Sequence, residues 1–192
     1  YGIAAGPITY GDTLGRIEFL RARYVQAGYG VGCRVILALE NRPEYFMHWY
    51  ALNGLGASVV PVNPDLRHAE LVYMIGHAEP RLAVAIGPRG EELTAAAEEA
   101  GVAMPVIEID DVPPNAGPLS VGSDTTPLRR EAAMLYTSGT TGKPKGCVLS
   151  NLYFLYAGEW YRNVGGLCEL KDGERMITPL PLFHMNAMAV SS

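Results

Sequence analysis

The chain contains the stretch Tyr136-Thr137-Ser138-Gly139-Thr140-Thr141-Gly142-Lys143-Pro144-Lys145-Gly146, which joins two short apolar runs at 132–135 and 147–149. Both runs are typical of buried strands. The three glycines of the stretch allow positive φ angles and let backbone N–H groups approach a ligand closely. Successive N–H groups around one concavity bind anions, and hydroxyl and lysine side chains add further donors. We therefore predict a loop between two strands that binds a polyphosphate.

Other interpretations of this stretch fit less well. A hairpin turn of small polar residues is common, but about two to five residues are enough to reverse the chain. The Walker pattern fails, because only two residues separate Gly139 from Gly142 where that motif has four, and Pro144 stands where it has its hydroxyl residue. The dinucleotide pattern fails as well, because Gly54-Leu55-Gly56 has Val59 in place of the third glycine and leads into a strand.

Strands and helices are expected to alternate along the chain. Apolar runs predict strands at 34–39, 58–62, 81–86, 105–109, 132–135, 147–149 and 175–178. Apolar residues at helical spacing predict helices that begin near Asp12, Asn41, Pro64 and Glu91, and a further helix capped by Ser150 or Asn151. Asn41 and Glu44 form a variant of the capping box, with Pro43 in the first turn. The alternation predicts an α/β fold with a largely parallel sheet flanked by helices.

The segment 110–130 is different from the rest of the chain, because it is rich in proline and small polar residues and lacks apolar periodicity. We predict an exposed connection there, which is also the softest boundary within a single folding unit of residues 1–192.

Composition excludes several classes of protein. The net charge is −5 without a Lys/Arg cluster, so nucleic acid is not expected as a partner. No apolar run approaches the roughly 18 residues of a membrane span. Cys33, Cys147 and Cys168 lie far apart without a C-x-x-C pair, which indicates a reducing compartment and predicts a cytoplasmic location.

The stretch from Thr137 to Gly146 resembles the phosphate loop of the adenylate-forming superfamily, which includes acyl-CoA synthetases, luciferases and the adenylation domains of peptide synthetases. Three further segments are similar to motifs of that family in the same order. They are Thr9-Tyr10 with Leu14, the segment 51–64 that ends in Pro61-Val62-Asn63-Pro64, and Pro179-Leu180-Pro181-Leu182-Phe183-His184.

The resemblance covers essentially the whole chain. It implies that residues 1–192 are the N-terminal portion of the large AMP-binding domain. Nothing in the chain resembles the family's Tyr-Gly-x-Thr-Glu segment, its Thr-Gly-Asp segment, its hinge or its C-terminal lysine. The remainder of the enzyme and its C-terminal domain are therefore expected to be absent.

The resemblance also assigns roles to individual residues. Lys145 is the expected catalytic lysine beside the β- and γ-phosphates, and His184 is the expected gate on the path of the carboxylate. The residues expected to bind the nucleotide are Thr137, Ser138, Gly139, Thr140, Thr141, Gly142 and Lys145. Thr137 is also the candidate contact to magnesium, with backbone capping as the alternative.

Simpler roles are expected for other conspicuous residues. Gly146 is expected to serve backbone conformation, and Lys143 to be solvated. The histidines at 48, 68 and 77 have no metal spacing and are expected to be structural. Trp49 and Trp160 are predicted to pack in the core. Met185, Asn186 and Met188 line the acyl side or pack in the core.

The function implied by the resemblance is ATP-dependent activation of a carboxylic acid to an acyl-adenylate, followed by thioester formation with coenzyme A. ATP, magnesium and coenzyme A are the expected cofactors, and a small carboxylic acid is the expected substrate. The Ala157-Gly158 helix and the loop at His184 mildly resemble the crotonobetaine/carnitine–CoA ligase branch.

Two alternatives stay open: another acyl-adenylating enzyme, such as a peptide-synthetase domain, and a nucleotide- or phosphate-binding module without turnover. The chain alone is expected to be inactive. It is also expected to self-associate, because an incomplete sheet leaves apolar area and strand edges uncovered.

Overall fold

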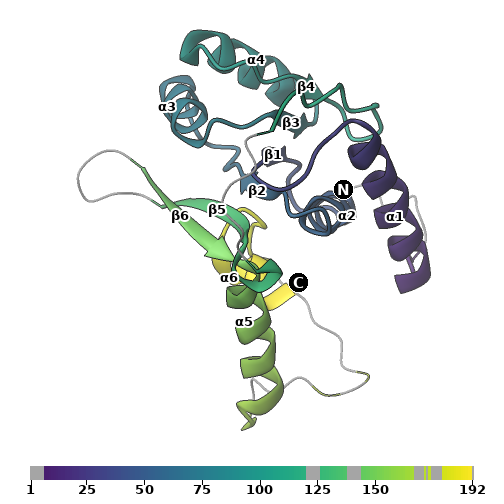
Figure 1. Cartoon of the computed structure of the whole chain (residues 1–192). Coiled ribbons are helices and arrows are strands. Elements are labelled where there is room, and N and C mark those ends of the chain that lie inside the picture. Colours follow the sequence, from purple (N-terminus) through teal and green to yellow (C-terminus); the bar gives the residue numbers. More distant parts are fainter. Residues whose placement is uncertain are drawn as a thin grey trace.

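The computed structural model describes residues 7–119, 126–137, 144–166, 171, 173 and 179–191. These residues form a six-stranded sheet with the strand order β4-β3-β1-β2-β5-β6 (Figure 1). The first five strands are parallel to one another, and β6 is antiparallel to β5 at one edge. The strands are β1 (Arg34–Ala38), β2 (Ser58–Pro61), β3 (Leu82–Ala85), β4 (Val106–Ile107), β5 (Glu131–Thr137) and β6 (Lys145–Ser150). The predicted α/β class with a largely parallel sheet is confirmed.

Helices cover both faces of the parallel part of the sheet. On one face α1 (Tyr10–Gln26) packs against α2 (Pro43–Asn53), and on the other α3 (His68–Ala78) packs against α4 (Pro88–Ala100). The remaining helices are the short 3₁₀ helix η1 (Pro127–Arg129), α5 (Asn151–Asn163) and α6 (Met185–Ser191). The β5–β6 hairpin and α5 extend away from these layers (Figure 1).

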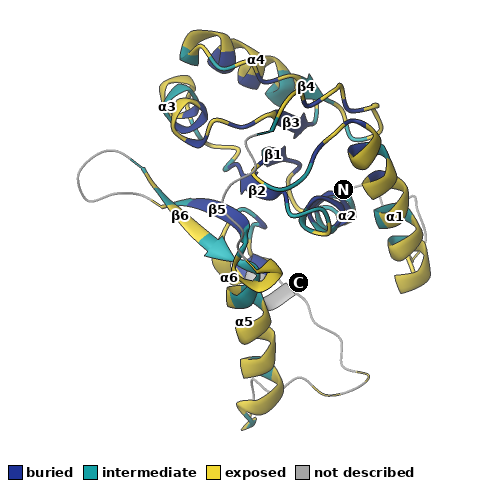
Figure 2. Ribbon diagram, in the orientation of Figure 1, coloured by how far each residue is buried: buried dark blue, intermediate teal, exposed yellow. Residues whose placement is uncertain are grey.

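The core is divided by the sheet into two clusters, because successive side chains of a strand point to opposite faces. Along β1, Val35 and Leu37 pack toward α1 and α2, whereas Ile36 packs toward α3 and α4. The strands β1, β2 and β3 are buried on both faces, which explains why their sequences read as continuous apolar runs rather than as alternating ones (Figure 2).

Four of the five predicted helix starts are wrong by a few residues. Helix α3 begins at His68 and not near Pro64, and α4 begins at Pro88 and not near Glu91.

The N-cap of α1 is Thr9. Its side chain accepts from the Asp12 amide, and the Asp12 carboxylate accepts from the Thr9 amide. Asp12 is thus the N3 member of a capping box and not the cap itself. Helix α2 begins after Arg42 without a side-chain cap, so Asn41 and Glu44 do not form the expected box. Of the two predicted caps of α5, the structure selects Ser150, whose side chain accepts from the Tyr153 amide.

The connection 110–130 is only partly exposed. Ala116 is buried, and its amide donates to the carbonyl of Ala27 at the end of α1. The Arg16 guanidinium pairs with Asp110 across the same junction. The connection therefore closes the α1 side of the core. The predicted strand at 175–178 lies outside the described residues.

Helix α5 departs most from expectation. None of its residues, all of which the structure describes, is buried. Trp160 is 53% exposed, so the prediction that it packs in the core is wrong, whereas Trp49 on α2 is 2% exposed as predicted. Most of α5 is accordingly yellow in Figure 2. No helix among the described residues is long and apolar enough to cross a membrane.

Candidate nucleotide-binding site

The predicted phosphate loop joins the carboxyl end of β5 to the beginning of β6. Thr137 is the last residue of β5 and is directly opposite Lys145, the first residue of β6. Both residues are exposed. The loop residues that the sequence assigned to the nucleotide, Ser138, Gly139, Thr140, Thr141 and Gly142, lie outside the described residues. The structure therefore places the two described members of the predicted site side by side at the base of the loop.

The carboxyl ends of the parallel strands share one edge of the sheet, which is where ligands bind in open α/β folds. The connection after β1 leads through α2 to β2, and the connection after β2 leads through α3 to β3 on the other side of β1. The two helices lie on opposite faces, as right-handed crossovers require. A pocket of about 230 Å³ opens at the resulting switch point and is lined by Ala38, Glu40, Val62, Pro64, Ile86, Pro88, Arg89 and Glu92. The end of β5 at Thr137, where the predicted phosphate loop starts, and this pocket therefore lie on the same edge of the sheet.

Gly146 has a different role from the one expected of it. Its φ angle is not positive, so the backbone there does not require glycine. A Cβ at this position would lie 2.5 Å from Cε of Met134 and 3.3 Å from ring atoms of His77 and Tyr136. Glycine is needed because three side chains fill the space above the strand, and not because of backbone conformation.

The same three side chains fasten the hairpin to α3. The Tyr136 hydroxyl lies 2.7 Å from Nδ1 of His77 and donates to the carbonyl oxygen of Met74 at 3.3 Å. Burial raises the pKa of Tyr136 to about 12, so its hydroxyl stays protonated near neutral pH. His77 is thus structural, as predicted. The contact ties the end of β5 to α3.

The segment that carries His184 reaches the same edge of the sheet through Asn41. The Asn41 Nδ2 group donates to the carbonyl oxygen of Leu180 at 2.9 Å, and the amide of Leu182 donates to Asn41 Oδ1 at 2.8 Å. Asn41 follows β1, so this pair of bonds attaches residues 180–182 to the carboxyl edge. Sequence reasoning assigned Asn41 to a helix cap and missed this contact, for which no local signal exists.

His184 itself is exposed and its ring lies against that of Phe183, with centroids 4.6 Å apart. The helix α6 that follows is held from two sides. On α2, the Tyr45 hydroxyl donates to Sδ of Met188 over 3.5 Å, and on α5 the Tyr153 hydroxyl donates to Sδ of Met185. Met188 is fully buried in the core, which is the packing alternative of its two expected roles.

The other histidines serve the scaffold. Nδ1 of His48 is 2.7 Å from the Tyr24 hydroxyl, and its Nε2 is 3.2 Å from the carbonyl oxygen of Ile109. His68 pairs with Glu99 on the surface between α3 and α4. No group of three or more His, Cys, Asp or Glu side chains in the described part of the chain is arranged to hold a metal ion.

Comparison with known proteins identifies the family. The family model described as "AMP-binding enzyme" matches residues 4–191, almost the whole chain. The chain belongs to the AMP-binding enzyme family. The resemblance of its motifs to the adenylate-forming superfamily is thereby confirmed.

Several relatives of this AMP-binding chain are CoA ligases. It is 31% identical to the sulfoacetate–CoA ligase of Cupriavidus necator, over 96% of this chain and 37% of that protein. It is 28% identical to the crotonobetaine/carnitine–CoA ligase of Shigella dysenteriae, over 86% of this chain and 34% of that protein. The crotonobetaine/carnitine–CoA ligase branch is thus among the relatives, but its identity to this chain is no higher than that of the sulfoacetate–CoA ligase.

The fold is that of solved members of the family. The ATP-bound crystal structure of MatB from Rhodopseudomonas palustris superposes with a TM-score of 0.68 at 26% identity, over 98% of this chain and 38% of that one. The chain therefore spans little more than a third of the length of the relatives it matches.

Proposed function

We propose that this protein takes part in ATP-dependent activation of a small carboxylic acid, forming an acyl-adenylate that is then passed to the thiol of coenzyme A. The carboxylate oxygen attacks the α-phosphorus and pyrophosphate leaves; the thiolate then attacks the acyl carbon and AMP leaves. Family membership and relatives that are CoA ligases support the proposal. The observation that carries it is the pairing of exposed Thr137 and Lys145 at the base of the predicted phosphate loop.

Lys145 is proposed to neutralise charge on the β- and γ-phosphates as pyrophosphate leaves. An ammonium is a compact charge with three donors, and a lysine at the start of a strand can point it into the loop. Ser138, Thr140 and Thr141 are proposed to donate their hydroxyls to phosphate oxygens, while Gly139 and Gly142 bring backbone N–H groups close.

Magnesium would be held mainly by oxygens of the nucleotide. Among described residues at this position Thr137 offers one hydroxyl, and Mg²⁺ commonly keeps several waters and binds substrate phosphates with only one or two protein groups. The Thr137 side chain fits that role as a single contact, and the ion would supply additional charge neutralisation at the phosphates.

His184 is proposed to gate the path of the carboxylate. A general base is not required for the first step, because a carboxylic acid is already ionised at neutral pH. The anchoring of residues 180–182 by Asn41 supports this role, since it places the His184 segment at the edge that carries the phosphate loop.

A location in the cell and a substrate class are also proposed for this protein. Cys33 and Cys147 are unbridged, which supports a reducing compartment and hence the cytoplasm. A carnitine-like acid is proposed as a substrate because a crotonobetaine/carnitine–CoA ligase is among the relatives, and a fatty acid is the other substrate class proposed.

ATP binding to the 192-residue chain, measured by calorimetry, tests the proposal. Lys145→Ala should weaken the affinity for ATP by about tenfold or more, because it removes a charge-assisted contact. Lys171→Ala, which removes an equal charge outside the loop, is the matched control and should leave the affinity within about twofold. Equal loss in both variants, or no ATP binding at all, would overturn the assignment of the loop.

Pyrophosphate release separates the two classes of function that the sequence left open. The chain is expected to bind ATP without releasing pyrophosphate in the presence of short carboxylic acids, because its sequence lacks the family's adenine, ribose and carboxylate-contacting motifs. Sustained release by the chain would contradict that expectation and would establish activity directly.

A further inference from the structure

Residues 134–137 of β5 extend beyond the pairing of that strand with β2. Among the described residues, the register of β2 with β5 contains one pair, Val59 with Ala133. The amide of Val62 donates to β1, so the backbone of its neighbour Pro61 faces β5 instead. Pro61 has no N–H group to donate there. The backbone bonds from β2 therefore end before the end of β5 is reached.

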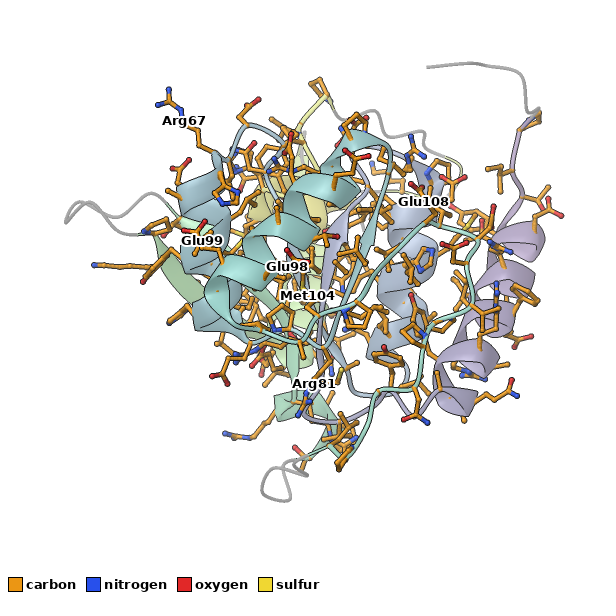
Figure 3. The ribbon with its side chains drawn as sticks, turned by 90° about the horizontal axis from the view of Figure 1, so that it is seen from above. Arg67, Arg81, Glu98, Glu99, Met104 and Glu108 are labelled. Atoms are coloured by element: carbon orange, nitrogen blue, oxygen red, sulfur yellow. The ribbon has the colours of Figure 1, made fainter. Side chains whose placement is uncertain are left out.

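Helix α3 supplies the support that β2 does not. The helix spans the molecule between Arg67 and Arg81, which Figure 3 shows at opposite ends of the molecule. It packs against α4, and its buried residues are Leu71, Met74, Ile75 and Ala78. His77 lies in the last turn of this helix. Because packed interiors deform little, the last turn of α3 is a fixed point to which the hairpin can be attached.

Tyr136 connects this end of β5 to α3. Its Oη lies 2.7 Å from Nδ1 of His77 and donates to the carbonyl oxygen of Met74 over 3.3 Å. A hydroxyl has one proton and can still accept, so Nδ1 of His77 carries a proton and donates to Tyr136. The two rings meet edge to face, with centroids 5.8 Å apart. A side chain and a backbone group of α3 thus hold one side chain of β5.

The same contact reaches β6 through Gly146, which lies directly opposite Tyr136. A Cβ at Gly146 would lie 3.3 Å from ring atoms of both His77 and Tyr136, so glycine lets the two rings lie close to this strand. Thr137 and Lys145 form the next pair of the ladder. The contact between Tyr136 and His77 is therefore one residue away from both described ends of the predicted phosphate loop.

This contact and the proposed phosphate contacts lie on opposite faces of the hairpin. Neighbouring side chains of a strand alternate between faces, and the side chains of a directly opposed pair share a face. Tyr136 packs with the cluster toward α3 and α4, whereas Leu135, on the same face as Thr137, packs with the cluster toward α1 and α2. Substitution of Tyr136 or His77 therefore removes no group of Thr137 or Lys145.

We propose that His77 and Tyr136 are positioning residues of the phosphate site, which hold the backbone of Thr137 and Lys145 against α3. The inference rests on the proposed function of Lys145. Donors that are held in place before the ligand arrives bind charge without a further cost of ordering. Loss of the contact should therefore weaken ATP binding, although every group that is proposed to contact the phosphates is still present.

Calorimetry of ATP binding to the 192-residue chain tests the inference. Tyr136→Phe and His77→Leu each remove the bond between the two side chains at nearly constant volume, and each should weaken the affinity for ATP by about fivefold. The double variant should be about as weak as either single variant, because both remove the same bond. His77→Asn keeps an N–H donor close to the position of Nδ1 and should restore most of the affinity.

Tyr24→Phe is the matched control. The Tyr24 hydroxyl also lies 2.7 Å from Nδ1 of a histidine, His48, but Tyr24 belongs to the cluster on the other face of the sheet. Loss of this hydroxyl should lower the free energy of unfolding and change the affinity for ATP by less than about twofold. In ¹⁵N spectra of the chain without ATP, the amides of Lys145 and Gly146 should shift in Tyr136→Phe and not in Tyr24→Phe.

Equal losses of ATP affinity in Tyr24→Phe and Tyr136→Phe, or no recovery in His77→Asn, would reduce the contact to general stability and overturn the inference. ATP binding that depends on Lys145 but is unchanged in Tyr136→Phe and His77→Leu would overturn the inference alone and leave the proposed function intact. No ATP binding, or binding that Lys145→Ala does not weaken, would overturn both. If Tyr136→Phe fails to fold, His77→Leu and His77→Asn decide the question, because His77 is exposed.

Discussion

At the scale of single residues, His48 joins α1, α2 and the connection after β4 by two hydrogen bonds. The carbonyl of Ile109 can only accept, so Nε2 of His48 carries the proton and donates to it. Nδ1 then accepts from the Tyr24 hydroxyl. The neutral imidazole therefore satisfies both partners, and a second proton on the ring would reverse the Tyr24 bond and bury a positive charge.

This arrangement predicts a loss of stability in mild acid. Burial lowers the pKa of His48 to about 4 from an ordinary value of 6.5. The hydrogen bond to Ile109 and the charge of Asp110 act in the opposite direction, and the charges of Arg16 and Arg23 add to the lowering. Between these two pKa values the unfolded chain binds the proton and the folded chain does not, so stability falls as the pH drops through this window. Because of this residue, we expect the free energy of unfolding, measured with urea, to be about 2 kcal/mol lower at pH 5 than at pH 7.

His48→Gln should remove that part of the pH dependence, although it lowers stability at neutral pH. His68→Gln is the matched control, because His68 is exposed and pairs with Glu99 on the surface. An unchanged pH dependence in His48→Gln would show that His48 does not carry it.

At the scale of elements, Asn41 ties the chain after β1 to the segment before α6. Its amide group pairs with backbone groups that are 139 and 141 residues away in sequence. Each such bond contributes about 1 kcal/mol. Asn41→Ala should therefore release residues 180–182 while the sheet stays intact.

Hydrogen exchange measures this effect directly. The amide of Leu182 should exchange about tenfold faster in Asn41→Ala, and the amides of β1 and β2 should keep their protection. Asn115→Ala is the control, because the Asn115 side chain makes a local bond, accepting from the Gly117 amide. Unchanged exchange at Leu182 would mean that α6 packing alone holds the segment.

At the scale of the whole molecule, an apolar surface runs along α5. It consists of Leu155, Tyr156 and Trp160, all more than half exposed, and is defined here as the α5 surface. A groove of about 690 Å³ between α2 and α5, with Trp49 and Phe154 in its wall, adjoins it. The edge strand β6 is also partly exposed, with Val148 55% exposed. Exposed apolar area and a strand edge favour association.

We therefore expect the 192-residue chain to self-associate through the α5 surface. Sedimentation velocity over a wide concentration range should show an average mass that rises with concentration. Trp160→Glu should raise the midpoint of association by about tenfold or more, since it buries a charge in the contact. Tyr10→Glu changes an aromatic side chain that is 97% exposed on α1, and should have no such effect. A monomer at every concentration would contradict the expectation.

Much of the architecture follows from local sequence rules. The continuous apolar runs of β1 to β3, the hydroxyl cap at Ser150 and the alternation of elements are each encoded within a few neighbouring residues, and all are confirmed. The pairing of Thr137 with Lys145 also follows, because a loop between adjacent strands brings its two ends together.

Several of the incorrect predictions concern long-range contacts and not local sequence rules. The partners of Asn41, the space above Gly146, the docking of Ala116 and the exposure of Trp160 depend on segments that are distant in sequence. A side chain at helical spacing has the same pattern whether or not another element covers it, and an asparagine near a helix start can cap it or bond elsewhere. Sequence pattern therefore established the α/β class and the position of the loop, while long-range packing established which side chains meet at each edge of the sheet, because contact requires the partner to be in place.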